Sequence, residues 1–240
     1  MKKRLLSILL MCCMVLTLLP TAVFAEGETD VSINETNFPD ANFRTVVKEY
    51  DTDKDENLSR VEIEAVKEIK CYHKDIRSLT GIEYFTALQT LKCYSNQLTS
   101  LDISGNTALK SLDCAKNQLA ALDVSQNTRL NLLLCFNNHL TSLDTSNQKR
   151  LHTLSCNNNN YPITITNDRN YDLSDLPGTF DVNKASNWSG GTVSGNILTV
   201  DHDKDSVTYT YDCGNGKTAN FMLTCGKASY TVNFNTNGGS

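Results

Sequence analysis

A repeat of 21 residues constrains this chain more than any other feature. Its unit reads L-x-x-L-x-C-x-x-N-x-L, followed by x-x-L-D-[IVT]-S, and four successive copies keep the same register. One such unit cannot bury its own apolar side chains, so neighbouring units must stack and share a core. The repeated leucines and cysteines are Leu88, Leu91, Cys93, Leu109, Leu112, Cys114, Leu130, Leu133, Cys135, Leu151, Leu154 and Cys156.

Each unit is predicted to form one short strand and then to turn. The leucine and cysteine side chains point inward, and strands of adjacent coils lie about 4.8 Å apart. The asparagine of each unit stands at the bend, where its amide can bond backbone groups that are otherwise unpaired. A degenerate fifth unit, with Val66, Ile69 and Cys71, precedes the four, and Tyr161 marks the end of the pattern.

This unit resembles the leucine-rich repeat family, with cysteine in place of the third leucine. The resemblance implies a stacking scaffold, and such scaffolds bind partners on an extended surface. We therefore expect binding rather than catalysis.

Residues 51–62 form a second motif, which resembles the calcium loop of an EF-hand. Asp51, Asp53 and Asp55 occupy its first, third and fifth positions, Asn57 offers a backbone carbonyl, and Glu62 supplies the closing carboxylate. Oxygen ligands at alternate positions suit Ca²⁺, and extracellular sites of this kind bind it weakly. Glu56 departs from the pattern because the sixth position favours glycine. The alternative is a plain helical cap whose carboxylates only solvate a turn.

Helices are expected on both sides of this loop. Apolar residues follow helical spacing from Phe43 to Tyr50 and from Val61 to Ile69.

The N-terminus has the pattern of a secretory signal peptide. Lys2, Lys3 and Arg4 precede an apolar run, and Ala25 ends a small-residue cleavage site. A membrane anchor is the alternative, but the run is short for a bilayer span, and no other stretch is long and apolar enough. Loss of the first 25 residues leaves 19 basic residues against 27 acidic ones, a net charge of about −8. There is no basic stripe, so nucleic acid and anionic membrane surfaces are expected to be poor partners.

Seven cysteines remain after cleavage, and five of them occupy the inward position of the repeats. There a free cysteine acts as a small apolar side chain. Cys213 and Cys225 flank the turn sequence Gly214–Lys217, which predicts a hairpin. That hairpin would hold the two thiols roughly 25 Å apart, so we predict that they are not bridged.

Residues 161–227 are rich in threonine, valine, tyrosine and asparagine and predict an all-β module. Strands are expected near 163–166, 196–200, 207–211 and 220–224, with Trp188 as a core aromatic. The module resembles immunoglobulin-like domains, although its strand order cannot be read from the sequence.

The order of these parts resembles internalin-like surface proteins of Gram-positive bacteria. The implied fold is multidomain: a short leucine-rich-repeat solenoid with a helical EF-hand-like N-terminal cap, followed by an all-β immunoglobulin-like module. The last residues resemble the start of a Listeria- or Bacteroides-type repeat, which predicts that the natural protein continues past Ser240. The expected domains are a signal peptide (1–25), the cap (26–65), the repeats (66–160), the β module (161–227) and a truncated β repeat (228–240).

The repeat frame also predicts which side chains line the outward, concave strand face. Tyr72, Tyr94 and Phe136 are aromatics in one column of that face. Such exposed apolar groups are candidates for binding hot spots, unless a loop covers them. The predicted partner-binding residues are Tyr72, Lys92, Tyr94, Leu132, Leu134 and Phe136.

Catalytic motifs are missing from the sequence. Its four histidines form no H-E-x-x-H motif, and it has neither a G-x-S-x-G elbow nor a phosphate-binding glycine loop. We therefore predict that the chain is not an enzyme. It is expected to be a secreted or cell-surface adhesion module that binds a protein or a surface glycan. The alternatives are a non-catalytic accessory region of a longer secreted hydrolase and a structural spacer.

Overall fold

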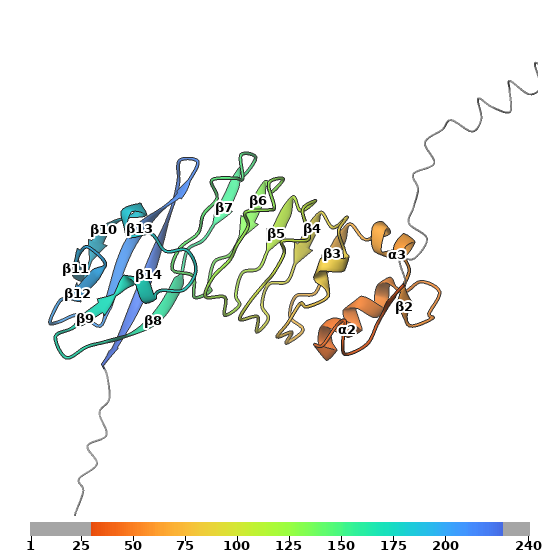
Figure 1. Cartoon of the computed structure of the whole chain (residues 1–240), viewed down its shortest axis with the longest axis horizontal. Coiled ribbons are helices and arrows are strands. Elements are labelled where there is room, and N and C mark those ends of the chain that lie inside the picture. The colour runs from red at the N-terminus through yellow and green to blue at the C-terminus, as the bar shows by residue number, and fades with distance from the viewer. Residues whose placement is uncertain (1–29, 228–240) are drawn as a thin grey trace, which may run out of the picture. The chain divides into compact units, whose positions relative to one another are not determined.

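The computed structural model describes residues 30–227. In chain order these form a small cap, a stack of coils around a parallel sheet, and a module of two sheets (Figure 1). The predicted signal peptide (1–25) and the predicted truncated repeat (228–240) lie outside the described residues. Within residues 30–227, no helix is long and apolar enough to cross a membrane.

The cap contains two short helices and one pair of short antiparallel strands. Asp40 caps the first helix by accepting hydrogen bonds from the backbone N–H groups of Asn42 and Phe43. Ser59 caps the second helix in a capping box with Glu62. The elements are β1 (Val31–Ser32), α2 (Ala41–Val47), the 3-10 helix η1 (Lys48–Tyr50), β2 (Asn57–Leu58) and α3 (Arg60–Ala65).

The second predicted helix is shorter than its apolar spacing suggested. It ends at Ala65, and Ile69 lies on the strand that follows. Val61, which was assigned to the apolar face of this helix, is 78% exposed. The helix has fewer than two turns, so only one side of it packs against the cap. Ile69 instead packs in the first coil of the repeats, as the central residue of the strand.

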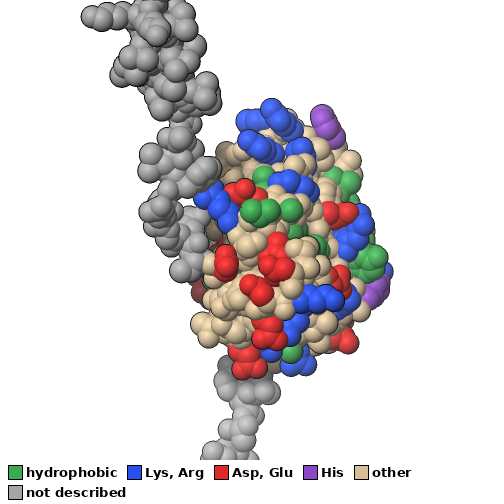
Figure 2. Space-filling view, turned by 90° about the vertical axis from the view of Figure 1, so that its right-hand side faces the viewer, with side chains coloured by type: hydrophobic (Ala, Val, Ile, Leu, Met, Phe, Trp, Pro, Cys, Tyr) green, Lys and Arg blue, Asp and Glu red, His purple; other side chains and the backbone are tan. Residues whose placement is uncertain are grey.

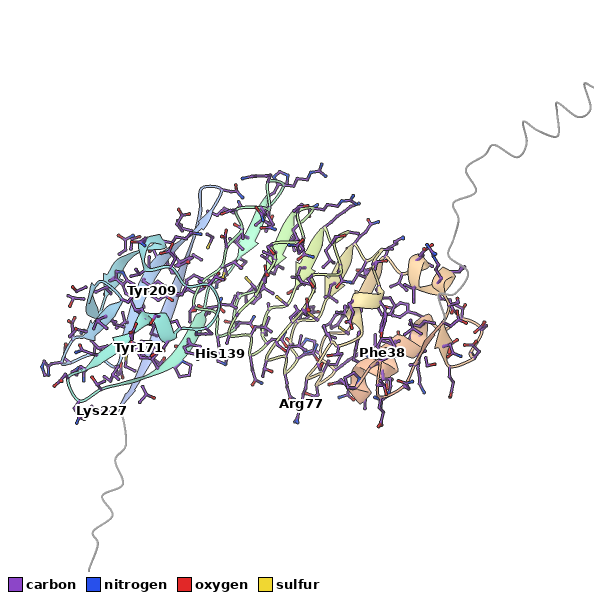
Figure 3. All side chains as sticks on the ribbon, viewed as in Figure 1. Phe38, Arg77, His139, Tyr171, Tyr209 and Lys227 are labelled. Atoms are coloured by element: carbon purple, nitrogen blue, oxygen red, sulfur yellow. The ribbon has the colours of Figure 1, made fainter. Side chains whose placement is uncertain are left out.

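The cap closes the first coil of the repeats through Phe38. This side chain is fully buried, and Figure 3 labels it at the boundary of cap and coils. Gly81 makes the close approach possible: it has a φ of +100°, and a Cβ atom there would stand 2.2 Å from the Phe38 ring. Phe38 also packs against Tyr84 of the 3-10 helix η2 (Ile82–Tyr84), with ring centroids 5.7 Å apart.

The repeats form one five-stranded parallel sheet in the order of the chain. Each strand has three residues, and its central Leu or Ile points inward. Successive strands pair in register, so that equivalent repeat positions stand side by side. The strands are β3 (Glu68–Lys70), β4 (Thr90–Lys92), β5 (Ser111–Asp113), β6 (Leu132–Leu134) and β7 (Thr153–Ser155).

Two ladders of side chains run through the stack behind this sheet. The first ladder consists of the inward-pointing cysteines of the repeats, here called the ladder cysteines: Cys71, Cys93, Cys114, Cys135 and Cys156. These residues are at most 5% exposed, and all are free thiols. The asparagines bond adjacent coils: Asn117 Oδ1 accepts from Leu98 N at 3.0 Å, and its Nδ2 donates to the carbonyls of Cys93 and Cys114. Asn96, Asn138 and Asn159 make equivalent bonds.

A second amide ladder, not predicted from the sequence, lies at the opposite turn. Asn106 and Asn127 are fully buried, and each donates its Nδ2 to two backbone carbonyls of the preceding coil. Gln148 holds the same position in the last coil and donates to Val124 O at 2.6 Å. Each of these carbonyls also accepts a backbone N–H within its own turn, so the amides add a second bond that links one coil to the next.

The C-terminal module consists of a four-stranded and a three-stranded sheet. Strand orders are β10-β13-β14-β8, in which β14 and β8 run parallel, and β11-β12-β9. The four predicted strands are present, and three further short ones were missed. The strands are β8 (Asn159–Ile165), β9 (Asn170–Asp172), β10 (Ala185–Ser189), β11 (Gly191–Ser194), β12 (Ile197–Val200), β13 (Ser206–Gly214) and β14 (Lys217–Lys227), with 3-10 helices η3 (Leu173–Asp175) and η4 (Val182–Lys184).

Both sheets contribute to one aromatic and aliphatic core. Tyr209 and Phe221 stack with ring centroids 5.8 Å apart, and the half-buried Trp188 stacks on Tyr209 at 4.6 Å. Leu198 of β12 joins them in the core. The predicted hairpin joins β13 to β14, so Cys213 and Cys225 stand at opposite ends of the paired strands, and both are free.

Several buried hydrogen bonds tie the last coil to this module. Tyr209 Oη donates to Thr141 O at 2.6 Å, and Thr145 donates its N–H and its hydroxyl to Cys213 O at 2.7 and 2.8 Å. Asn159 belongs to both parts, because it is the last rung of the asparagine ladder and the first residue of β8. No separate linker therefore stands at residue 160, where the sequence placed a domain boundary.

Candidate functional site

The outward side chains of the parallel sheet form the candidate binding surface, here called the sheet face. Since the central residue of each strand points inward, the residues on either side of it, and the one after each ladder cysteine, point outward. Strand pairing aligns them in columns across the five coils. The columns are Glu68, Thr90, Ser111, Leu132 and Thr153; Lys70, Lys92, Asp113, Leu134 and Ser155; and Tyr72, Tyr94, Ala115, Phe136 and Asn157.

An aromatic cluster occupies the end of the sheet face next to the cap. Tyr72 and Tyr94 stack with ring centroids 4.6 Å apart and an angle of 9° between their planes. The His73 ring stands edge-on to both, at 5.9 and 5.4 Å. Tyr72 is 37% exposed, so this rigid cluster presents an aromatic surface to solvent.

A charged group lies beside these aromatics. The Glu68 carboxylate pairs with Lys70 Nζ at 3.0 Å and with Lys92 Nζ at 3.1 Å. The hydrogen bonds from these two lysines lower the pKa of Glu68, and the bond to Glu68 raises the pKa of Lys70. All three side chains are partly exposed, so solvent screens the pairs, and their main effect is to fix the position of the Lys92 ammonium group.

An apolar cluster lies on the coil of β6. Leu132, Leu134 and Phe136 are half-buried and belong to adjacent columns of the sheet face. Half-buried aliphatic and aromatic groups on a rigid sheet lose little entropy on binding, which favours them as anchors for a partner.

One coil separates these two clusters. Ala115, the residue aligned between Tyr94 and Phe136, is 1% exposed, so the aromatic column is interrupted there. Asp113 on the same coil is half-buried, and desolvation raises the pKa of its carboxyl against an opposing hydrogen bond from Ala115 N. The six predicted residues thus divide into Tyr72, Lys92 and Tyr94 on one side and Leu132, Leu134 and Phe136 on the other.

The predicted calcium loop brings three aspartates together at the cap. Single carboxylate oxygens of Asp51, Asp53 and Asp55 all lie within 4.8 Å of one another, and within residues 30–227 this is the only such group of possible metal ligands. The charge of Asp55 contributes to a raised pKa of Asp53, after desolvation. Figure 2 views this end of the molecule and shows acidic side chains gathered on it, with basic side chains around them.

The backbone of the loop has the required turn although the sixth position lacks glycine. Glu56 takes that position with a φ of +65°, the left-handed conformation. The two Asp51 carboxylate oxygens accept from three successive backbone N–H groups: Lys54 and Asp55 at 2.7 and 3.3 Å, and Glu56 at 3.0 Å. These bonds offset the cost of the left-handed residue and hold the loop closed around the aspartates.

Glu62, the predicted closing ligand, is engaged elsewhere. Its Oε1 accepts from the N–H and the hydroxyl of Thr52, at 2.5 and 2.7 Å, and its Oε2 accepts from the N–H and the hydroxyl of Ser59, both at 2.9 Å. The bonds from Thr52, and then those from Ser59, lower the pKa of Glu62 to about 2. Its role as a calcium ligand stays a prediction, because Glu62 would have to exchange these bonds for the ion.

Asn57, the other predicted ligand, lies on β2 and pairs with Ser32 of β1. Ser32 donates its hydroxyl to Asn57 Oδ1 at 2.8 Å. The sequence reasoning missed β1 as the strand that supports the loop, since two residues give no periodic signal.

Neither the histidines nor the thiols form a second chemical site among the described residues. His139 contacts Asn160 O through Nδ1 at 2.7 Å, and burial raises the pKa of Cys71 and of Cys213 to about 12. Thiols held protonated at neutral pH are poor nucleophiles.

Comparison with known proteins identifies the fold of the repeats. No protein-family model matches the chain. Internalin J of Listeria monocytogenes is 34% identical over 71 residues, which are 29% of this chain and 8% of that protein. The functional domain of InlJ from Listeria monocytogenes, which includes a cysteine ladder, matches with 36% identity and a TM-score of 0.51 over 55% of this chain and 29% of that one. An internalin, InlF, from the same species gives 21% identity and a TM-score of 0.48 over 56% of this chain and 41% of that one.

These similarities support an internalin-like leucine-rich-repeat fold for this chain. The chain spans less than a third of the length of either Internalin J match.

Proposed function

We propose that this chain is a secreted or cell-surface module that binds a protein partner through the sheet face. The observation that carries the proposal is the apolar cluster of Leu132, Leu134 and Phe136, which a rigid sheet holds half-exposed within a surface of polar side chains. The aromatic and charged cluster around Tyr94 and Lys92 adds a second point of contact. One coil with polar side chains separates the two clusters, so the sheet face fits a partner that contacts it at two patches.

The similarity to Internalin J supports a role in adhesion rather than in catalysis. The runner-up is a spacer or an accessory region of a longer secreted hydrolase, in which the sheet face makes no specific contact.

A binding experiment with matched variants tests the sheet face. Residues 26–227 are immobilised and exposed to bacterial and host surface proteins, and a captured partner is then purified and titrated. Phe136→Ala and Tyr94→Ala are expected to weaken its binding by about tenfold or more each, as for buried aromatic anchors. Thr153→Ala, on the same face but outside both clusters, is the control. Unchanged affinity in both aromatic variants would favour the spacer.

The cap is further proposed to hold Ca²⁺ at Asp51, Asp53 and Asp55, with the carbonyl of Asn57 and the carboxylate of Glu62 as additional ligands. The converging carboxylates and the ordered loop support this proposal. The ion would neutralise the aspartates and link the loop to α3. At a calcium concentration about tenfold above a Kd of about 1 mM, the expected stabilisation is about 1.4 kcal/mol.

Calorimetry with and without calcium tests this second site. The melting temperature of residues 26–227 is expected to rise with Ca²⁺ and to fall with a chelator, whereas Asp53→Asn should show neither change. An equal response of the wild type and Asp53→Asn would exclude the loop as the site.

A further inference from the structure

A hollow of about 400 Å³ lies where the last coil meets the four-stranded sheet, outside the sheet face and the calcium loop. Its walls come from segments far apart in the sequence: the bend before β8 together with the first residue of β8, the edge strand β10, and the central strands β13 and β14. The residues that line it are Asn158, Asn159, Asn187, Thr208, Tyr209, Thr210, Asn220, Phe221 and Met222. None of them is charged. Asn159, Tyr209 and Phe221 are at most 2% exposed, so the accessible side chains are amides, threonine hydroxyls and one thioether.

Hydrogen bonds link three of the polar side chains at the hollow. Thr210 Oγ1 donates to Asn220 Oδ1 at 2.9 Å and accepts from Asn187 Nδ2 at 3.5 Å. Within residues 30–227 these bonds leave the Asn220 Nδ2 donor and the Asn187 Oδ1 acceptor without a protein partner. A free amide donor and a free amide acceptor on one surface match the two hydrogen-bonding roles of a hydroxyl group.

The strands aim these amides at the hollow. A β-bulge between Ser186 and Ser189 interrupts the pairing of β10 with β13, and Asn187 stands in it with a φ of +54°. Bulges often redirect a side chain beside a binding site. Asn158, in the bend between β7 and β8, also has a positive φ, of +55°, and asparagine tolerates the left-handed conformation.

The same chemistry continues along this side of the sheet. On β13 and β14, outward residues alternate with core residues, and most of them are threonine or asparagine. Solvated sheet faces commonly carry lysine and glutamate, which also discourage edge pairing. Here the only charged side chain among the outward positions of these two strands between Thr208 and Thr224 is Asp212, near the turn.

We infer that this hollow, the asparagine hollow, binds a neutral oligosaccharide. An anionic ligand would lack a cation to pair with, and a cationic one would lack a carboxylate. A protein partner would need a larger apolar anchor than Met222 provides. Uncharged hydroxyls match the amides and threonine hydroxyls, and Met222 offers an apolar contact for the C–H face of a sugar ring. The site lies outside the sheet face, so it stands or fails independently of the protein partner proposed above.

Nuclear magnetic resonance with isotopically labelled residues 26–227 tests the inference. The probes are the β-1,4-linked trimer of N-acetylglucosamine, maltotriose and a mannose trimer, each titrated to about 10 mM. At least one is expected to shift the amide signals of Asn158, Asn187 and Asn220 saturably, with a Kd of about 1 mM. A glycopeptide that carries the same sugar then separates the two sources: tighter binding than the free trimer indicates a glycoprotein, and equal binding a free polysaccharide.

Two variants locate the site independently. Thr210→Val with Asn220→Ala removes the bonded pair and keeps strand-compatible side chains, and Asn187→Gly removes an amide while permitting the left-handed backbone. Each is expected to weaken binding by at least about tenfold. Thr218→Val, an exposed threonine on the same side of β14 outside the hollow, should bind as the wild type does.

Three results would overturn the inference. The first is the absence of a saturable shift with every neutral trimer. The second is undiminished binding in folded Thr210→Val, Asn220→Ala and Asn187→Gly proteins. The third is a shift of the hollow's signals with protein concentration alone, which would assign this surface to a second copy of the chain.

Discussion

At the scale of single residues, the structure gives Glu62 a role that its place in a motif did not predict. Its two oxygens join the start of the loop at Thr52 to the start of α3 at Ser59. These bonds stabilise the cap by themselves, without a metal ion. The three aspartates therefore lie in a loop that hydrogen bonds already order.

Replacing Glu62 with glutamine tests this role. In the presence of a chelator, Glu62→Gln is expected to lower the free energy of unfolding by about 1 kcal/mol, because a neutral amide accepts the capping bonds less well. The folded-state pKa of Glu62 is depressed from 4.5 to about 2, so its contribution is complete above pH 4.5 and is lost as the pH falls toward 2. Denaturant titrations should therefore show the two proteins converging between about pH 5 and pH 2. A difference that appears only when calcium is present would contradict the structural role.

The ladder cysteines allow a second test at this scale. Cys114 is fully buried, and burial raises the pKa of its thiol well above the usual range. Cys114→Ser places a hydroxyl in an apolar stack and is expected to cost about 1–3 kcal/mol in unfolding free energy. Cys114→Ala is the control for lost volume.

Under native conditions a thiol reagent should label the half-buried Cys225 before any ladder thiol. Early labelling of Cys114 would show that the stack opens readily.

At the scale of the repeated element, every coil has a residue in the left-handed conformation at the same repeat position. It lies two positions after the ladder cysteine, with φ between +54° and +55° in all five coils. The repeat thus requires a sharp turn there whatever residue occupies the position. The residues are His73, Ser95, Lys116, Asn137 and Asn158.

Glycine at one of these positions should therefore stabilise the protein. Lys116 has an exposed side chain, and its backbone carries the cost of the left-handed region, about 1 kcal/mol. Lys116→Gly is expected to raise the free energy of unfolding by up to about 1 kcal/mol. Lys110→Gly, a change of the same residue type at a position without positive φ, should lower it. Denaturant midpoints measure both, and destabilisation by Lys116→Gly would show that its side chain contributes contacts of its own.

At the element scale, the sequence predicted the elements that a repeat or a run of β-forming residues marks. The repeat spacing predicted the coils and the buried cysteines, since a period of 21 residues needs no distant information. The β9, β10 and β11 strands were missed because their short segments contain few apolar β-forming residues, whereas the equally short β12 is the run Ile197–Val200. In the candidate site, the frame identified the outward columns but not the burial of Ala115, which depends on the sizes of its neighbours.

At the scale of the whole molecule, the last coil and the β module share their boundary. Thr141 and Thr145 are fully buried by contacts with the module, and Lys184 pairs with Asp144 at 3.2 Å. The module therefore caps the open end of the stack, as the helical cap does at the other end.

Removal of the module should thus destabilise the repeats. A chain of residues 26–160 loses the rest of β8 after Asn159 and Asn160, and it uncovers the backbone of the last coil. We expect its thermal transition, followed by circular dichroism, to be broad or to lie at least about 10 °C below that of residues 26–227. The longer chain should unfold in a single transition. Equal and sharp transitions would show that the repeats need no C-terminal cap.

The sequence by itself determined the stacking register, the buried cysteine and asparagine ladders and the hairpin at Gly214–Lys217. These features follow from periodicity and from local turn preferences, which act within one coil or one turn. Only the tertiary structure decided how the outward side chains divide into two clusters, which bonds occupy Glu62, and that Asn158, Asn187 and Asn220 meet in one hollow. Those arrangements depend on strands brought together from distant parts of the chain, and no local pattern specifies which side chains will become neighbours.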